Sequence, residues 1–264
     1  MKKLAVLGPK GTYSDLGAQI YLKNSREDIE IEYFNSFYSV FKNIKDYALI
    51  PIENSLAGYV GENLDFLMDS DYKVIHQVKL RVDFSLVGSK NMKRIYVQII
   101  AYEECKEFFF NHDYEVIKCN SNSEVLNRYL NDLNESGAIL PKHLIKPEFE
   151  VIDTNIGDSN YNETRFFVLD KKWTLPDCDD YVFSLVIESE NDRSGILYEI
   201  LSVFNQLNIN LLGIASRPLK TKIGEYKFFI ECEIKKEKAY DIRLLFDILN
   251  KTFDAKFLGI YNKI

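Results

Sequence analysis

The stretch Asn162-Glu163-Thr164-Arg165-Phe166-Phe167-Val168-Leu169 places a hydroxyl and a guanidinium at the start of a strongly apolar strand. Two other polar turns follow apolar runs far upstream, at Gly8-Pro9-Lys10-Gly11-Thr12-Tyr13-Ser14 and at Pro51-Ile52-Glu53-Asn54-Ser55. Because ligands of α/β folds bind at strand ends, we expect these three segments to line one cleft. Hydroxyls, an amide and backbone N–H groups in such a cleft predict a site for a small anionic ligand.

The charge and hydropathy of the chain argue against several classes of partner. Its 264 residues carry a formal net charge of -7, without the clustered Lys and Arg of a nucleic-acid face. The first apolar run, Leu4 to Leu7, is too short for a signal peptide, and no stretch approaches the roughly 18 apolar residues of a membrane span. We therefore expect a cytoplasmic protein that binds neither nucleic acid nor membrane.

The cysteines and histidines do not form a metal motif. The four cysteines have no C-x-x-C spacing, and the three histidines are scattered. We expect no metal and no redox pair among Cys105, Cys119, Cys178, Cys232, His76, His112 and His143.

Strands and helices alternate over the first 155 residues, which indicates an α/β fold. The alternation breaks near residue 75 and returns near 155, so we expect two lobes that the chain crosses between twice. The periodicity predicts strands at 3–7, 29–34, 47–52, near 95, 114–118, 137–140 and 151–154, and helices at 15–22, 39–44, 63–68, 103–110 and 123–130, with Ser14 as the first N-cap.

Residues 171–179 are typical of a linker, and the pattern changes after them. Strands are predicted at 182–188, 210–216, 225–234 and 253–260, with helices at 195–207 and 239–249. This βαββαβ order is ferredoxin-like. Its strands carry apolar residues on both faces, which predicts a second covering layer from another subunit.

These motifs together resemble the prephenate dehydratase family with a C-terminal ACT regulatory domain, over nearly the whole chain. Residues 8–14 are similar to the family's G-P-x-G-T-[FY]-S turn, 51–55 are its P-I-E-N-S motif, and 162–166 fit N-x-T-R-F. Further on, Asp192-Arg193-Ser194-Gly195-Ile196-Leu197 and Ile214-Ala215-Ser216-Arg217-Pro218 stand at the family's effector loop and at its I-E-S-R-P segment.

The resemblance implies a bilobal, periplasmic-binding-protein-like catalytic domain at 1–172 and a ferredoxin-like ACT domain at 180–264. Lobe 1 would span about 1–75 and 155–172, and lobe 2 about 76–154. The implied reaction belongs to phenylalanine biosynthesis: prephenate loses its ring carboxylate as CO2 and its C4 hydroxyl as water, giving phenylpyruvate without a cofactor. Such a site must hold two carboxylates and help a hydroxide to leave.

Thr164 is the catalytic residue that the resemblance implies. A threonine hydroxyl is a poor acid in water, so it needs a fixed orientation toward the C4 hydroxyl. Strand alternation places Thr164 and Phe166 on one face, and we expect Phe166 to wall the ring pocket. Arg165 either pairs with a substrate carboxylate or forms a buried ion pair, and both roles stay open.

The two upstream turns supply the other expected contacts. Free N–H groups at the start of the first helix can receive a carboxylate, although ordinary helix capping explains the same residues. The second turn adds an amide and a hydroxyl. The expected substrate-binding residues are Gly11, Thr12, Ser14, Glu53, Asn54, Ser55, Arg165 and Phe166.

One segment departs from the family. Where the family has S-H-P-Q-A-x-x-Q-C, this chain has Val97 at the serine position and Glu104 at the glutamine position. Valine cannot donate a hydrogen bond, and an ionised glutamate repels an anionic substrate. Either residues such as Gln98 or Glu104 make the polar contacts with the substrate instead, or the enzyme is slow, or it no longer turns over. We favour a working enzyme, because Thr164 and residues 51–55 are intact.

The resemblance also implies inhibition by phenylalanine, bound between ACT domains of a homodimer or homotetramer. The expected effector-binding residues are Gly195, Ile196, Leu197, Asn210 and Leu211. Core packing explains the aliphatic ones at least as well. Ser194, Ile196 and Ala215 replace the family's proline, alanine and glutamate, so the effector's identity stays open.

Two other functions stay open. An arogenate dehydratase acts on a substrate whose amino group replaces the keto oxygen, and Glu104 is a candidate partner for that ammonium. A catalytically weak or inactive amino-acid sensor fits the altered segment at 97–105. Thr164→Ala separates an enzyme from a sensor, because it removes turnover and spares ligand binding.

Overall fold

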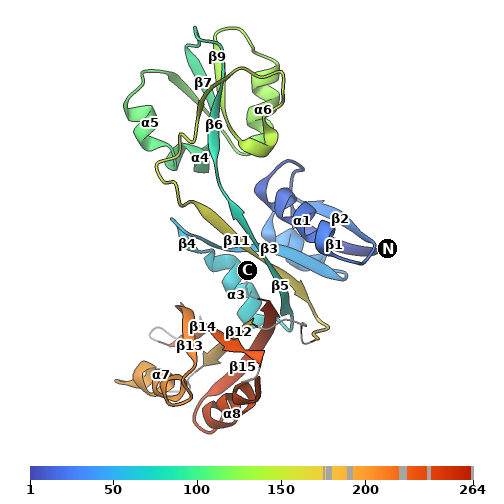
Figure 1. The fold of residues 1–264 in the computed structure, drawn as a ribbon, viewed down its shortest axis with the longest axis vertical. Coiled ribbons are helices and arrows are strands. Elements are labelled where there is room, and N and C mark those ends of the chain that lie inside the picture. Colours follow the sequence, from blue (N-terminus) through green and yellow to red (C-terminus); the bar gives the residue numbers. More distant parts are fainter. Residues whose placement is uncertain (175, 177–179, 189–192, 220–224, 237–238, 263–264) are drawn as a thin grey trace. The chain divides into compact units, whose positions relative to one another are not determined.

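The computed structural model describes residues 1–174, 176, 180–188, 193–219, 225–236 and 239–262 (Figure 1). Cys178, Asp192 and part of the predicted linker lie outside the described residues. The chain forms two compact units. Unit 1 comprises Met1–Lys45, Glu53–Gly58 and Lys79–Arg165, and unit 2 comprises Asp46–Ile52, Tyr59–Val78 and Phe166–Ile264. The predicted α/β class is confirmed.

Unit 1 begins with a parallel strand pair, β1 (Lys2–Leu7) and β2 (Ile29–Phe34). The helices α1 (Tyr13–Asn24) and α2 (Phe37–Lys42) follow these strands. The N-cap of α1 is Thr12, whose hydroxyl accepts a hydrogen bond from the Asp15 N–H, so the prediction of Ser14 is wrong. The cap lies two residues earlier because Thr12 has extended backbone angles, whereas Ser14 already lies inside the helix.

The second sheet of unit 1 has the strand order β10-β6-β9-β7-β8. Side chains on alternate faces of β7 enter separate apolar clusters, Ile95 and Val97 on one side and Tyr96 on the other. The chain folds this way because both faces of the sheet are covered by helices. The strands are β6 (Phe84–Gly88), β7 (Arg94–Gln98), β8 (Glu115–Cys119), β9 (Ser136–Pro141) and β10 (Val151–Thr154); the helices are α4 (Ile99–Glu103), α5 (Lys106–Phe110), α6 (Asn122–Leu130) and η1 (Lys142–Leu144).

The helix predicted near 103–110 is found only over 106–110, as α5, because the separate helix α4 ends at Glu103. Asp158 stabilises the N-terminus of α5: its carboxylate accepts hydrogen bonds from the N–H groups of Lys106 (2.9 Å) and Glu107 (3.0 Å). A carboxylate at this position satisfies the unpaired donors of a new helix N-terminus. Asp158 lies far away in the sequence, so local periodicity could not reveal the break.

Three strands pass from one unit into the other: β3 (Tyr47–Asn54), β5 (Lys73–Arg81) and β11 (Glu163–Asp170). In unit 2 they lie in the order β3-β11-β5, and the short strand β4 (Gly58–Tyr59) pairs with β3. Helix α3 (Gly61–Asp69) follows β4. Consecutive residues of β3 are fully buried, which indicates a strand covered on both faces.

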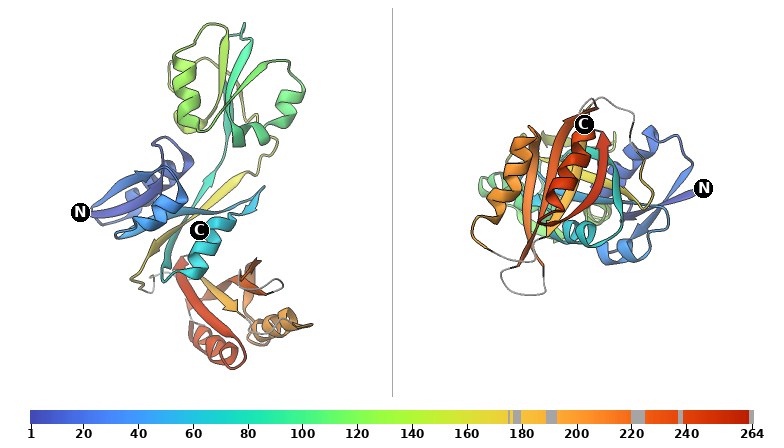
Figure 2. Two further views of the ribbon diagram at one scale, coloured as in Figure 1. Left: turned by 180° about the vertical axis from the view of Figure 1, so that it is seen from behind. Right: turned by 90° about the horizontal axis from the view of Figure 1, so that it is seen from below.

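The C-terminal part of unit 2 has the predicted βαββαβ order, with the antiparallel sheet β13-β14-β12-β15. Figures 1 and 2 show α7 and α8 on one side of this sheet. Their apolar faces pack on it around Phe183, Ile200, Phe204 and Leu245. The elements are β12 (Asp180–Glu188), α7 (Ile196–Gln206), β13 (Asn210–Pro218), β14 (Tyr226–Lys235), α8 (Ala239–Leu249) and β15 (Asp254–Asn262).

The second face of this sheet is covered by the same chain, not by another subunit as the sequence suggested. The rings of Tyr59 and Phe229 lie 5.6 Å apart, and those of Phe167 and Tyr261 lie 5.2 Å apart. Gly213 allows this closeness, because a Cβ there would lie 2.1 Å from the Tyr59 hydroxyl. The apolar residues on this face are therefore an internal layer.

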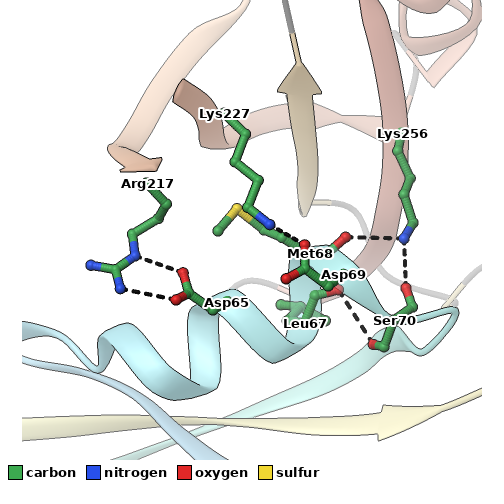
Figure 3. Close-up of polar contacts among 8 residues, drawn as sticks. All are labelled: Asp65, Leu67, Met68, Asp69, Ser70, Arg217, Lys227 and Lys256. Carbon is green, nitrogen blue, oxygen red and sulfur yellow. Dashed lines mark hydrogen bonds and ion pairs between the residues drawn. The ribbon is translucent and has the colours of Figure 1, made fainter. Parts of the chain in front are cut away.

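Three basic side chains of the sheet hold α3 (Figure 3). Arg217 donates to both carboxylate oxygens of Asp65, at 2.7 and 3.1 Å, and Lys227 pairs with Asp69. Lys256 donates to the carbonyls of Met68 (3.0 Å) and Ser70 (2.6 Å). The last carbonyls of a helix lack internal partners and attract cations, so Lys256 caps α3 at its C-terminal end.

In the described part of the chain, no helix has the length and apolarity to cross a membrane.

Candidate active site

The end of β3 and the start of β11 bring two of the predicted motifs together within unit 1. Asn54 Nδ2 lies 3.2 Å from Thr164 Oγ1 and 2.8 Å from Asn162 Oδ1. All three side chains are at least half-buried, and Asn162 is 4 % exposed. Asn54, Asn162 and Thr164 therefore form one polar cluster, as the strand-end positions of their motifs predicted.

The hydrogen-bond directions in this cluster follow from the fixed donors. Asn54 Oδ1 accepts from the N–H groups of Leu56 and Ala57, each at 2.9 Å, which leaves its Nδ2 to donate to Asn162 and Thr164. Because Thr164 Oγ1 accepts this bond, the hydroxyl proton points elsewhere and is free to serve a ligand. The network orients Thr164 as a donor.

Ser55 connects the two strand ends by hydrogen bonds, which use its hydroxyl group in place of a contact with a ligand. Its Oγ donates to the Tyr161 carbonyl (2.6 Å) and accepts from the Glu163 N–H (2.9 Å). Its backbone N–H donates to the Glu163 carbonyl at 2.9 Å. A serine has one hydroxyl proton, and here Ser55 donates it in a hydrogen bond to the Tyr161 backbone carbonyl. Ser55 therefore stabilises the geometry in which Asn54 meets Thr164.

Arg165 and Glu53 form an ion pair, with Arg165 Nη2 2.7 Å from Glu53 Oε2. Side chains alternate along a strand, so Glu53 and Arg165 point away from the face that carries Asn54 and Thr164. Of the two roles left open for Arg165, the ion pair is present in the structure, and pairing with a substrate carboxylate stays a prediction.

The loop before α1 is closed by Asp15, a residue that the sequence reading did not single out. Asp15 Oδ2 accepts from the Gly11 N–H at 2.8 Å, and Oδ1 accepts from the Tyr33 hydroxyl at 2.5 Å. Gly11 has φ +89°, which favours glycine, and Ser14 is 8 % exposed. The predicted N–H donor of Gly11 is therefore already engaged within the loop, which weakens its case as a ligand group.

Side chains from α6 and η1, which accompany the second sheet, contact this loop. Ser123 Oγ donates to the Lys10 carbonyl at 2.7 Å, and His143 Nε2 donates to the Gly11 carbonyl at 3.1 Å. A cavity of about 230 Å³ lies beside them, lined by Tyr13, Leu16, Arg81, Asp83, Lys142 and His143. Arg81 and Lys142 give this cavity positive charge, although Arg81 also pairs with Asp83 at 2.8 Å. Burial lowers the pKa of His143.

The altered segment enters the site through Glu104. Burial raises the pKa of Glu104, and its interaction with Asn162 lowers it. Burial raises the pKa of Tyr13, and the charge of Glu104 raises it further. Val97, in contrast, is fully buried in an apolar cluster, and Gln98 caps α4 without a side-chain bond. Of these three residues, Glu104 is the one with an electrostatic effect that involves Asn162 and Tyr13.

Phe166 lies outside the polar cluster, and Asn162 was missed by the prediction. Phe166 belongs to unit 2 and is 1 % exposed, so its ring is part of a core. Asn162 was not predicted as a site residue, although its Oδ1 accepts a hydrogen bond from Asn54. Its position at the first residue of the N-x-T-R-F stretch was the available signal.

The predicted effector residues differ in exposure. Gly195 has φ +88° and precedes α7, and Ile196 is 8 % exposed within the core. Leu197 is 38 % exposed, Asn210 is exposed, and Leu211 packs partly against the core. The side chains of Leu197 and Asn210 are therefore exposed, and Ile196 packs in the core.

Within the described residues, no group of three or more His, Cys, Asp and Glu side chains is placed to hold a metal ion. Cys105, Cys119 and Cys232 are buried free thiols.

Comparison with known proteins identifies the family. A model of the family "Prephenate dehydratase" matches residues 4–174. A prephenate dehydratase of Methanocaldococcus jannaschii is 34% identical over 242 residues, which cover 89% of this chain and 89% of that protein.

Solved structures agree with this assignment. The prephenate dehydratase of Staphylococcus aureus has 28% identity and a TM-score of 0.85, covering 99% of this chain and 100% of its own. The prephenate dehydratase of Arthrobacter aurescens, in complex with L-Phe, shares the fold at 24% identity and a TM-score of 0.81, covering 99% of this chain and 90% of its own. The chain therefore belongs to the prephenate dehydratase family.

Proposed function

We propose that this chain is a cofactor-independent lyase that converts prephenate to phenylpyruvate, CO2 and water, and that Thr164 is its catalytic residue. The observation that carries the proposal is the orientation of Thr164. Asn54 donates to Thr164 Oγ1, so the hydroxyl presents its proton to a bound ligand. A fixed donor stabilises the charge that develops on the departing C4 oxygen without reorganising during the reaction.

The remaining site residues have supporting roles in this proposal. Asn54 and Ser55 orient the reacting hydroxyl, and the pair of Glu53 with Arg165 holds the strand ends. Tyr13, Arg81 and Lys142 line the cavity, where the two cationic side chains favour a substrate carboxylate. Among the predicted loop contacts, Gly11, Thr12 and Ser14 shape this wall, and Phe166 supports the strand from the core.

The experiment is turnover of prephenate, followed by phenylpyruvate formation, in the parent chain, Thr164→Val and Thr164→Ser. Valine keeps the strand's branched shape and removes the hydroxyl, and Asn54 Nδ2 retains Asn162 as its acceptor. We expect kcat to fall by about 10²–10³ in Thr164→Val, as for loss of one oriented donor, and to survive in part in Thr164→Ser. Equal turnover in all three proteins would refute the role of Thr164. The absence of turnover in the parent would leave the sensor interpretation.

We further propose that residues 1–172 are the dehydratase domain and that 180–264 form an ACT domain that binds phenylalanine. The exposed Leu197 and Asn210 support an effector site near Gly195 and Leu211. The edge strand β13 exposes Leu212 (46 %) and Ile214 (41 %), which favours pairing with a second copy in a homodimer or homotetramer. The expected cytoplasmic location belongs to the same proposal.

Regulation is tested by adding phenylalanine to the turnover assay and to sedimentation velocity runs. We expect inhibition in the parent and weaker inhibition in Asn210→Ala. Inhibition requires that phenylalanine bind the inactive state more tightly than the active one. Unchanged rates at saturating phenylalanine would contradict this part without touching the catalytic proposal.

A further inference from the structure

The cavity of about 230 Å³ beside the loop before α1 lies next to the segment that leads into Thr164. The Val82 N–H donates to the Asn162 carbonyl at 2.8 Å. The two neighbours of Val82 in the chain, Arg81 and Asp83, line the cavity. Asn162 precedes Thr164 by two residues, a span of roughly 7 Å along a strand. This pairing places the cavity near the Thr164 hydroxyl, on the scale of one substituted six-membered ring.

Hydrogen bonds and a ring contact hold the walls of this cavity together. The Tyr13 hydroxyl donates to the Asp83 carbonyl at 3.2 Å, which joins α1 to the residues after β5. His143 Nε2 donates to the Gly11 carbonyl at 3.1 Å, which joins η1 to the loop before α1. The rings of Tyr13 and His143 meet edge to face, with their centroids 5.2 Å apart. The lining is therefore a fixed set of contacts within unit 1.

The lining of the cavity carries one more positive than negative charge. Its cations are Arg81 and Lys142, and its anion is Asp83. Arg81 donates through Nε to Asp83 Oδ1 at 2.8 Å, and its two terminal NH2 groups have no partner among the described residues. Burial lowers the pKa of His143, which favours the uncharged ring. The net charge of this lining therefore suits one carboxylate of a ligand and not two.

The proposed reaction treats the two carboxylates of prephenate differently. The ring carboxylate leaves C1 as CO2, and the side-chain carboxylate stays in phenylpyruvate. As the bond from C1 to the ring carboxylate breaks, its electron pair enters the ring, and the C4 oxygen leaves as hydroxide and takes a proton from water. A cation beside the departing carboxylate would stabilise the ionised ground state and lose that interaction as neutral CO2 forms, which would slow the step. A cation beside the retained carboxylate has no such effect.

We propose that the cavity binds the side-chain carboxylate that prephenate retains, through the Lys142 ammonium and the terminal NH2 groups of Arg81, and that the departing carboxylate lies outside the cavity. The retained carboxylate keeps its charge throughout the reaction, so these contacts are equally strong in the ground state and the transition state. They therefore lower KM without changing kcat. Phenylpyruvate keeps the same carboxylate and binds in the same place. This role rests on the proposed function, because it assigns a contact within the same site.

The test compares prephenate turnover with calorimetric binding of phenylpyruvate in the parent, Lys142→Gln, Asp83→Asn and Lys90→Gln. Lys142→Gln removes a cation, so KM for prephenate and Kd for phenylpyruvate should both rise about tenfold, with kcat unchanged. Asp83→Asn removes the anion beside Arg81 and keeps the main-chain carbonyl that holds Tyr13, so both constants should fall about threefold. Lys90, exposed on the turn between β6 and β7, is the matched control and should keep the parent's constants.

The opposite signs expected for Lys142→Gln and Asp83→Asn separate charge recognition from a structural role. Weaker binding in both variants, parent-like constants in Lys142→Gln, or no binding of phenylpyruvate to the parent would overturn the proposal. A lower kcat in Lys142→Gln with unchanged KM and Kd would also overturn it, because the cation would then act on groups whose charge changes. If the parent turns over no prephenate, the proposed function fails, and the phenylpyruvate titrations still decide the subsite: opposite shifts in the two variants support it and equal constants exclude it.

Discussion

Replacing Arg217 by methionine should destabilise unit 2 by releasing α3 from the C-terminal sheet. Arg217 makes two charge-assisted hydrogen bonds to Asp65, at 2.7 and 3.1 Å, which raise the pKa of the guanidinium (Figure 3). The Asp65 side chain is 11% exposed, so its carboxylate is left poorly solvated when the guanidinium is removed. Methionine keeps most of the aliphatic stem, which limits the change to the charge and its bonds.

The expected loss in the free energy of unfolding depends on how far the Arg217–Asp65 pair is buried. Removing one partner of a fully buried ion pair costs about 3–5 kcal/mol, whereas exposed pairs contribute about 0–1 kcal/mol. The Arg217 side chain is 32% exposed, which places this pair between the two limits. We expect a loss of about 2 kcal/mol for Arg217→Met, which lowers Tm by roughly 4–8 °C in a protein of this size.

A double-mutant cycle with Asp65→Asn isolates the pair from other contacts of Asp65. Thermal and urea unfolding of the two single variants and the double variant should give a coupling energy of about 1–2 kcal/mol. Arg193 and Glu199 form a matched control pair, because their side chains are 47% and 41% exposed and we expect no measurable coupling. Equal coupling in both cycles, or none between Asp65 and Arg217, would refute the reasoning from burial.

Two more predictions concern packing and reactivity. Gly213→Ala should destabilise by about 1–3 kcal/mol, because its Cβ would lie 2.1 Å from the Tyr59 hydroxyl and displace it from Glu231. Gly157→Ala, whose Cβ would meet nothing nearer than 3.7 Å, is the control, and similar melting curves for both variants would contradict the argument. Burial raises the pKa of Cys105 to about 12, so iodoacetamide at pH 8 should modify this residue only after unfolding, as peptide mass spectrometry would detect. Rapid labelling in the folded protein would show that the thiol is accessible.

The order of strands and helices was predictable from the sequence because it depends on local spacing. The strand at 29–34 has the predicted bounds, and the βαββαβ order follows the periods of two and 3.6 residues. The approach of Asn54 to Thr164 was also foreseeable, since both stand at strand ends in recognisable motifs. These features need only neighbouring residues and the general rules of α/β folds.

Contacts between distant segments were not predictable in this way. Asp158 starts α5 at Lys106, inside the helix expected at 103–110, and Asp15 accepts a hydrogen bond from the Gly11 N–H that was expected to bind a ligand. Arg217, read as part of a regulatory motif, instead holds Asp65 on α3. In each case a charged side chain finds donors or a counter-charge that only the folded chain brings near it.

The sequence alone determined the element order and the family, and it pointed to Thr164 as the proposed catalytic residue, because local periodicity and short motifs carry that information. The tertiary structure decided the direction of the bonds around Thr164, the burial of Glu104 and the internal covering of the C-terminal sheet. The physical reason is that hydrogen-bond direction, desolvation and close packing depend on groups far apart in the chain, whose positions are fixed only when the whole core forms.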